Sequence, residues 1–249
     1  MRELVELEIR ELLESYKYPD SLPVLGGSAR LALEETEYTD LGMKSVQQLM
    51  NTVDTYIEQP ERKLDAPFLL SVESVLKAKG RGTVVTGKVE QGVIAINDEL
   101  ELLSSEAQTI TCAGLEMFRR TLERAEVGDN IGILIRGLKK ELLVTRGNVL
   151  ATPGSIKVYS SFFGKVYILT KKEGGRHKGF STNYKPQFFF RTMNVTGAII
   201  LPENVLVVLP GDSLIFKVNL VSVVPLNVGL RFVMREGNLT IGAGIITEL

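Results

Sequence analysis

The spacing of short β-branched and aromatic runs from Phe68 to the C-terminus constrains the fold of this chain more than any other feature. Runs of Val, Ile, Thr and Phe are interrupted about every 8 to 12 residues by Gly, Asn-Asp or Pro-Gly. Each run is long enough for one strand, and each interruption supplies residues that favour turns. This pattern is typical of closed antiparallel barrels. We therefore predict a mainly β fold with two antiparallel β-barrels.

Pro153-Gly154 divides the predicted strands into two groups, so we expect a first barrel over residues 67–154 and a second over residues 155–249. The strands expected in the first barrel are Gly82–Gly87, Val93–Ile96, Glu99–Leu103 and Asn130–Ile135. Those expected in the second are Lys165–Leu169, Gln187–Thr192, Leu214–Leu220 and Leu230–Arg235.

Residues 1–58 have the apolar periodicity of helices. The apolar residues of the first helical stretch share one face, and they are Val5, Ile9, Leu12, Leu13 and Tyr16. A second helix is expected from Gly42 to Ile57, with an inward face made of Val46, Leu49, Met50, Val53 and Ile57. The charged residues 59–66 then precede Pro67 and predict a linker.

Composition excludes several classes of protein. The chain has 29 basic and 30 acidic residues, so nucleic acid could be attracted only by a local basic patch. One cysteine, Cys112, and one histidine, His177, cannot make a disulfide framework or a Cys/His zinc site. No apolar run approaches the 18 or so residues of a membrane span. We therefore expect no metal site, no catalytic residue and no membrane partner.

Three motifs contain residue types found in phosphate or nucleic-acid sites. Gly82–Val89 resembles a phosphate-binding loop but has Val where magnesium needs Ser or Thr, and it lies in a predicted strand, so it is read as structural. The basic loop Gly174–Lys178 fits either a nucleic-acid contact or a solvated hairpin tip. Glu116–Arg120 contains one carboxylate, which could accept a hydrogen bond from a base or ribose, and two cations nearby. No nucleotide pocket is expected from the residues alone.

Ten segments, read in order, resemble bacterial-type elongation factor Tu of bacteria and organelles. They are Gly80–Gly92, Gly114–Arg119, Gly128–Gly137, Arg146–Gly154, Glu173–His177, Lys185–Thr192, Asn194–Gly197, Pro210–Asp212, Arg231–Gly237 and Gly242–Gly244. The resemblance implies that the two barrels are the factor's second and third domains. It also implies that residues 1–58 are a remnant of the GTPase domain, with Leu4–Leu13 in a late helix.

By the same resemblance, the phosphate loop, the switch regions and the magnesium and guanine motifs would lie upstream of Met1. The first helix also has no capping residue before it, so we expect a missing upstream segment. We therefore expect no GTPase activity, and no cofactor, in this chain. GTP and Mg²⁺ would act only if a GTPase domain were supplied from elsewhere.

The resemblance implies three sets of binding residues. A pocket for the 3′ end of aminoacyl-tRNA would use Val84, Glu116, Phe118, Arg119, Asn130 and Leu134. Contacts to the tRNA arms would use Arg176, His177, Lys185, Gln187, Thr196 and Gly237. A residual guanine loop would consist of Ser28 and Ala29. Ser222 and Asn238-Leu239 depart from the family pattern and remove two cations.

The leading hypothesis is a translation protein that lacks the GTP-binding core and serves as an accessory or structural module binding RNA, the ribosome or protein. The alternative is the C-terminal portion of a conventional GTP-dependent factor that delivers aminoacyl-tRNA, with its front half outside this sequence or on a separate chain. Expected partners are a larger protein or ribonucleoprotein assembly held through residues 1–58, aminoacyl-tRNA, the ribosome and elongation factor Ts. The expected location is the matrix of a mitochondrion or plastid, or the bacterial cytoplasm.

Overall fold

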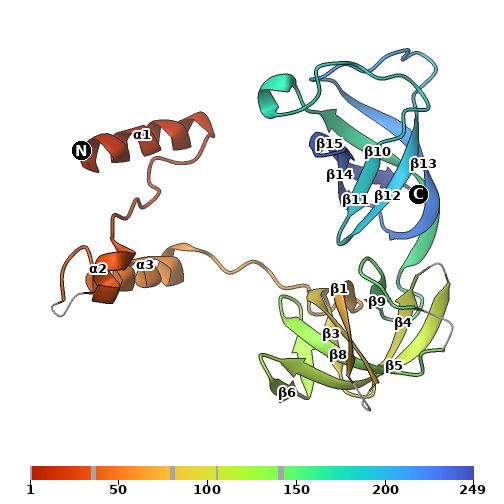
Figure 1. Cartoon of the computed structure of the whole chain (residues 1–249), viewed down its shortest axis with the longest axis horizontal. Coiled ribbons are helices and arrows are strands. Elements are labelled where there is room, and N and C mark those ends of the chain that lie inside the picture. Colours follow the sequence, from red (N-terminus) through yellow and green to blue (C-terminus); the bar gives the residue numbers. More distant parts are fainter. Residues whose placement is uncertain (1, 35–37, 79–81, 105, 140–142) are drawn as a thin grey trace. The chain divides into compact units, whose positions relative to one another are not determined.

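The computed structural model describes residues 2–34, 38–78, 82–104, 106–139 and 143–249 (Figure 1). Residues 1–61 and residues 62–249 form two compact units, and each is described by itself. The second unit holds two closed six-stranded antiparallel barrels, which confirms the predicted fold class.

The first unit contains the helices α1 (Arg2–Ser15), α2 (Ala29–Glu34) and α3 (Met43–Tyr56). The apolar periodicity predicted α1 and α3, whereas the short α2 was missed. Its start is set by Ser28, whose hydroxyl accepts a hydrogen bond of 3.2 Å from the Leu31 amide. A side-chain cap of this kind stabilises even a short helix, without needing a long apolar stripe.

The apolar faces of α1 and α3 lie on the surface of the first unit. On α1, the exposed fractions of Val5 and Leu12 are 47% and 57%. The predicted inward face of the second helix is wrong, because Val46, Leu49, Met50, Val53 and Ile57 are all exposed. The reason is that the described part of this unit contains helices and no strand, so these faces have no sheet to pack on.

The first barrel closes through the strand order β4-β9-β1-β2-β8-β5, with β5 pairing back to β4. Its strands are β1 (Leu69–Ala78), β2 (Gly82–Gln91), β4 (Glu99–Leu103), β5 (Ala107–Met117), β8 (Asn130–Arg136) and β9 (Val149–Ala151). The strand β6 (Arg120–Leu122) extends the hairpin from β5. The core is mainly aliphatic and includes Leu70, Val85, Val89, Ile131 and Ile133.

Residues Val93–Ile96 were predicted as a strand of this barrel, and that prediction is wrong. The strand β3 (Val93–Ala95) pairs with β7 (Arg124–Glu126) in a separate two-stranded sheet. The chain leaves the barrel at Gly92, whose φ is +75°. A Cβ atom there would lie 2.5 Å from the Ala66 carbonyl oxygen, so glycine is required at this change of direction.

The second barrel closes through the order β10-β13-β12-β11-β14-β15 (Figure 1). Its strands are β10 (Lys157–Ile168), β11 (Gln187–Phe190), β12 (Met193–Ile200), β13 (Ser213–Leu226), β14 (Arg231–Glu236) and β15 (Leu239–Glu248). A short 3-10 helix, η1 (Lys171–Glu173), follows β10. Because β10 and β11 are three places apart in a ring of six strands, they form opposite walls of this barrel.

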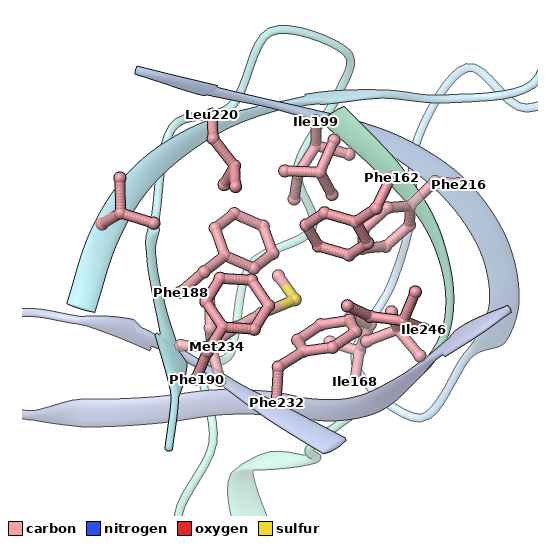
Figure 2. Close-up of a cluster of buried hydrophobic side chains, with 14 of the residues drawn as sticks. Phe162, Ile168, Phe188, Phe190, Ile199, Phe216, Leu220, Phe232, Met234 and Ile246 are labelled. Carbon is pink, nitrogen blue, oxygen red and sulfur yellow. The ribbon is translucent and has the colours of Figure 1, made fainter. Parts of the chain in front are cut away.

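Phenylalanine rings fill the second barrel (Figure 2). The Phe162 ring lies edge-on to the rings of Phe188, Phe190 and Phe232, with centroid distances of 5.9, 5.5 and 5.2 Å. Edge-to-face packing is the arrangement that aromatic quadrupoles favour. Gly164 leaves the room for it, because a Cβ atom there would lie 2.8 Å from the Phe232 ring.

Arg191 joins the two barrels within the second unit. Its side chain is only 8% exposed, and Nε donates to the Glu90 carboxylate at 3.0 Å. The remaining guanidinium nitrogens donate to the Pro225 carbonyl at 3.0 Å and to Asn227 Oδ1 at 2.6 Å. A second link runs from the Thr192 hydroxyl to the Val72 carbonyl at 2.8 Å.

Phe162→Ala is expected to lower the free energy of unfolding of the second barrel by about 3–5 kcal/mol, because it empties the centre of the aromatic cluster. Phe163→Ala is the matched control, since Phe163 follows in the same strand but is 36% exposed. The control should change stability by no more than about 1 kcal/mol. The methyl signals of Ile199 and Ile246 through a urea titration report on this barrel alone, and equal losses in the two variants would contradict the expectation.

Candidate functional site

A cavity of about 580 Å³ opens on the outer surface of the first barrel. Its lining comes from β1, β2, β5, β8 and the turn after β5, and comprises Glu73, Leu76, Lys77, Val84, Thr86, Glu116, Met117, Phe118, Asn130, Ile131 and Gly132. Four of the six residues predicted for a tRNA 3′-end pocket are therefore brought together: Val84, Glu116, Phe118 and Asn130. A neighbouring hollow of about 220 Å³ shares Val84 and Glu116 and adds Leu134.

Strand register explains why these residues converge. Val84 on β2 pairs with Leu134 on β8, and Glu116 on β5 pairs with Gly132 on β8. Gly132 also pairs with Thr86, so it lies between the two walls of the cavity. A Cβ atom at Gly132 would lie 3.3 Å from Val84, and the missing side chain keeps the floor open.

The rim of the cavity carries an unusual two-residue turn. Phe118 and Arg119 join β5 to β6, and both have positive φ values, of 50° and 64°. Such hairpin turns favour Asn-Gly or Gly-Gly, and other residues adopt them at an energetic cost. The Phe118 ring is 88% exposed and lines the cavity, whereas Arg119 is exposed and lines neither hollow. The turn thus presents an aromatic face at the cavity mouth.

The basic loop of the second barrel is fixed at its start by Glu173. The Glu173 carboxylate accepts hydrogen bonds from the Thr170 amide at 2.8 Å, the Thr170 hydroxyl at 2.7 Å and the Tyr167 hydroxyl at 2.9 Å. These bonds hold the pKa of Glu173 below its usual value. Gly175 follows, where a Cβ atom would lie 2.2 Å from the Leu169 carbonyl oxygen, so this loop packs tightly against the end of β10.

Arg176 is held beneath the surface, with a side chain that is 15% exposed. The guanidinium carbon lies 4.7 Å from the ring centroid of Tyr184 and 5.8 Å from that of Phe180, and Nη1 lies 3.4 Å from a Glu236 carboxylate oxygen. Nε and Nη1 are buried, and no acceptor among the described residues forms a hydrogen bond with them. Burial also raises the pKa of the Tyr184 hydroxyl to about 12. Because Glu236 already pairs with Arg176, an anion that reaches this guanidinium would compete with the Glu236 carboxylate.

The other predicted arm contacts lie around this cluster. Gln187 on β11 pairs with Thr196 on β12 and with Arg235 on β14, so these three residues cross one wall of the barrel. His177 and Lys185 are exposed beside Arg176 and Gln187 in the chain, and Gly237, with a φ of +56°, forms the turn after β14. The wall that contains β11 therefore gathers Gln187 and Thr196, with Lys185 and Gly237 at its ends, and Arg176 joins it through Tyr184 and Glu236. His177 is exposed directly after Arg176 and has no described contact to this wall.

Sequence reasoning missed three members of this cluster. Tyr184 stacks on Arg176, Glu236 pairs with it, and the Arg235 guanidinium lies 5.5 Å from the Phe189 ring centroid. Arg235 and Glu236 stand in a segment that carries the family resemblance, and that was the available signal. Nothing in the local pattern around Tyr184 indicates that its ring would meet a guanidinium.

Ser28 and Ala29, the predicted guanine loop, lie in the first unit. The Ser28 amide donates to the Leu41 carbonyl at 2.7 Å, and its hydroxyl caps α2. Ala29 begins α2 and is exposed. Both polar groups of Ser28 are used locally, and the residues described here offer no phosphate cradle beside them.

Within the described part of the chain, no group of three or more His, Cys, Asp or Glu side chains could hold a metal ion. Burial raises the pKa of the Cys112 thiol to about 11, so it stays protonated at neutral pH. Within the same residues, no helix has the length and apolarity to cross a membrane.

Comparison with protein-family models matches both barrels. Residues 82–151 match elongation factor Tu domain 2, and residues 155–249 match the elongation factor Tu C-terminal domain. The two matches together span about two thirds of the chain. The cavity lies in the first matched region, except for its β1 residues, and the Arg176 cluster lies in the second. Through these two domains, the chain belongs to the elongation factor Tu family.

Proposed function

We propose that this chain is a translation module of bacterial or organellar type, whose first barrel binds the 3′ end of aminoacyl-tRNA. The observation that carries the proposal is the cavity that gathers Val84, Glu116, Phe118 and Asn130. Its size and mixed lining suit an unpaired nucleoside with its attached group, because an apolar floor and a few polar side chains are what such ligands need.

The exposed Phe118 ring offers a stacking surface for a base at the cavity mouth. Glu116 is exposed and lines the cavity, so its carboxylate can accept a hydrogen bond from a ribose hydroxyl or a base amino group. Val84 and the exposed Leu76 add apolar contact. Together these groups bind a free 3′ end and do not suit a base held in a duplex.

The second barrel supports the same proposal through its β11 wall. Lys185 is exposed just before β11 and His177 is exposed just after Arg176, while Gln187 and Thr196 offer neutral hydrogen-bonding groups. Contacts of this kind hold a double-stranded arm by its backbone, without reading its sequence. Arg176 contributes by ordering Tyr184 and Glu236, since its guanidinium is largely buried.

The role of residues 1–58 separates the alternatives. As an accessory module, the chain would bind a larger protein or ribonucleoprotein assembly through this segment. As the C-terminal portion of a conventional factor, the same segment would complete a GTPase domain, and elongation factor Ts and the ribosome would be partners. The exposed apolar faces of α1 and α3 support a protein partner in either case, because soluble monomers seldom leave such patches uncovered. The site of action would be an organellar matrix or the bacterial cytoplasm.

This chain alone is expected not to bind or hydrolyse GTP, because residues 1–249 contain no phosphate loop with a magnesium ligand. Fluorescent GDP titrated into the purified chain should give no saturable signal. A dissociation constant in the micromolar range would show that the proposal is wrong on this point.

Glu116→Ala is expected to weaken aminoacyl-tRNA binding by about 1–3 kcal/mol, which is about 5-fold to 150-fold in the dissociation constant. Glu123→Ala is the matched control, because Glu123 is an exposed carboxylate near the same hairpin but outside the cavity. Both variants are compared by fluorescence anisotropy on intact aminoacyl-tRNA and on tRNA without its terminal nucleotide. If Glu116→Ala lowers the affinity for the shortened tRNA by as much as it lowers the affinity for intact aminoacyl-tRNA, the carboxylate does not contact the 3′ end.

Lys185→Ala is expected to reduce the slope of log affinity against log salt by about one unit, because one phosphate contact is lost. Lys165→Ala, on the opposite wall of the same barrel, should leave the slope unchanged. Titrations of aminoacyl-tRNA at several salt concentrations measure both slopes. Equal slopes for wild type and Lys185→Ala would exclude a phosphate contact at this residue.

A further inference from the structure

The outer wall of the second barrel centred on β10 exposes apolar side chains. Along β10 the residues alternate between buried and exposed, so Phe163 and Tyr167 point out of the barrel while Phe162 and Val166 point into it. Phe163 and Tyr167 are 36% and 39% exposed. On the flanking strands β13 and β15, Ile215 and Ile245 are 48% and 38% exposed.

Cations alternate with these apolar residues across the wall. Lys165 on β10 pairs with Ile215 on one side and with Ile245 on the other. Ile245 in turn pairs with Arg231 on β14. One row across four strands therefore reads Ile215, Lys165, Ile245 and Arg231. We call these residues, with Phe163, Tyr167 and Lys217, the β10 face.

The cations of the β10 face have no acidic partner in the described part of the chain. None of Lys165, Lys217 and Arg231 has a carboxylate oxygen within 4.0 Å there. The nearest interaction of Lys217 is with an aromatic ring, its Nζ lying 5.8 Å from the centroid of Phe163. Glu173 lies at the edge, but its carboxylate is engaged by Tyr167 and Thr170. Glu248, the β15 partner of Phe163, adds one exposed carboxylate at the end of the face, outside the row that holds Lys165 and Arg231.

We propose that the β10 face binds an acidic amphipathic helix of a partner protein. Its isoleucines and Phe163 offer apolar area, and its three unpaired cations offer charge to carboxylates. Adjacent strands are about 4.8 Å apart, so Lys165 and Arg231, which are two strands apart, are separated by roughly 10 Å. Helical residues seven apart lie about 10.5 Å apart on one face, so two glutamates at that spacing match both cations.

The mixture of groups favours protein over RNA as the ligand. The backbone of an RNA would place phosphates against the cations. It would leave the apolar side chains of Ile215, Ile245 and Phe163 facing water or ribose. An amphipathic helix covers both kinds of group at once. The face is also distinct from the proposed tRNA contacts, because β10 lies on the opposite wall from β11, and Arg231 begins β14 whereas Arg235 lies near the end of that strand. One barrel could therefore hold tRNA and a partner protein at the same time, and the inference goes beyond the proposed function.

The test uses the full chain and two synthetic stapled helices with leucine at one face. One helix carries glutamate at its other positions, and the other carries lysine. In NMR spectra, the methyl signals of Ile215 and Ile245 should shift in a saturable way with the glutamate helix and not with the lysine helix. Increasing salt should weaken the interaction. An RNA duplex serves as the third ligand, and should leave both methyl signals in place.

Variants then locate the contact. Lys165→Glu and Arg231→Glu should each weaken binding of the glutamate helix by about tenfold or more. Lys185→Glu, a charge reversal on the opposite wall, should leave helix binding unchanged, although it should weaken tRNA binding. Because these side chains are exposed, unchanged methyl spectra of the core verify folding. The proposal is overturned if neither helix shifts the methyl signals, if both do so equally, or if RNA shifts them instead.

Discussion

The burial of the Arg191 guanidinium between the two barrels is the interaction on which the arrangement of both candidate surfaces depends. A cation that is 8% exposed is stable only when carboxylates and carbonyls satisfy it from several directions. Glu90 supplies the charge, and the other oxygen of that carboxylate is bonded by Ser71. Removing Glu90 would leave the buried Arg191 cation without its counterpart, which costs far more than the pair contributes.

The position of this pair in the sequence gives it a functional consequence. Glu90 lies on β2, the strand that also carries Val84 and Thr86 of the cavity. Arg191 directly follows β11, the strand that carries Gln187 of the tRNA-arm wall. One ion pair therefore connects the two strands that present the proposed contacts. A ligand that reaches both gains affinity only if their separation is fixed, because flexible spacing lowers the effective concentration of the second contact.

Most of the fold could be predicted from local patterns, and the errors have a common cause. Alternation along β2 and β8 reports which side chains face inward, and this was sufficient to expect barrels. Alternation does not report the partner strand, so Val93–Ile96 was assigned to the wrong sheet. Alternation also does not show where a strand ends when that end depends on a single backbone angle. The strand expected over Gln187–Thr192 ends at Phe190, because Arg191 has a φ of +48° and turns towards Glu90. The predicted inward face of the second helix was wrong for a different reason, since amphipathicity identifies an apolar face but does not identify a surface that covers it.

The candidate surfaces were predictable to different degrees, and the difference follows from what holds each residue in place. Glu116 and Asn130 project from strands whose register is set by the barrel, so the family resemblance could place them beside one cavity. The environment of Arg176 depends on Phe180 and Tyr184, which follow it in an irregular loop, and on Glu236, which lies far away in the sequence on β14, so no local pattern describes it. On β10, the inward and outward positions also differ in what holds each residue in place. The inward positions of β10 are fixed by the phenylalanine core, where Gly164 and Phe162 have little room for change. The alternate positions point away from this core and contact only neighbours on the outer surface, such as Lys217 and Glu173, so a barrel of this family can keep its core and still acquire a new binding surface on any wall that its first ligand leaves free.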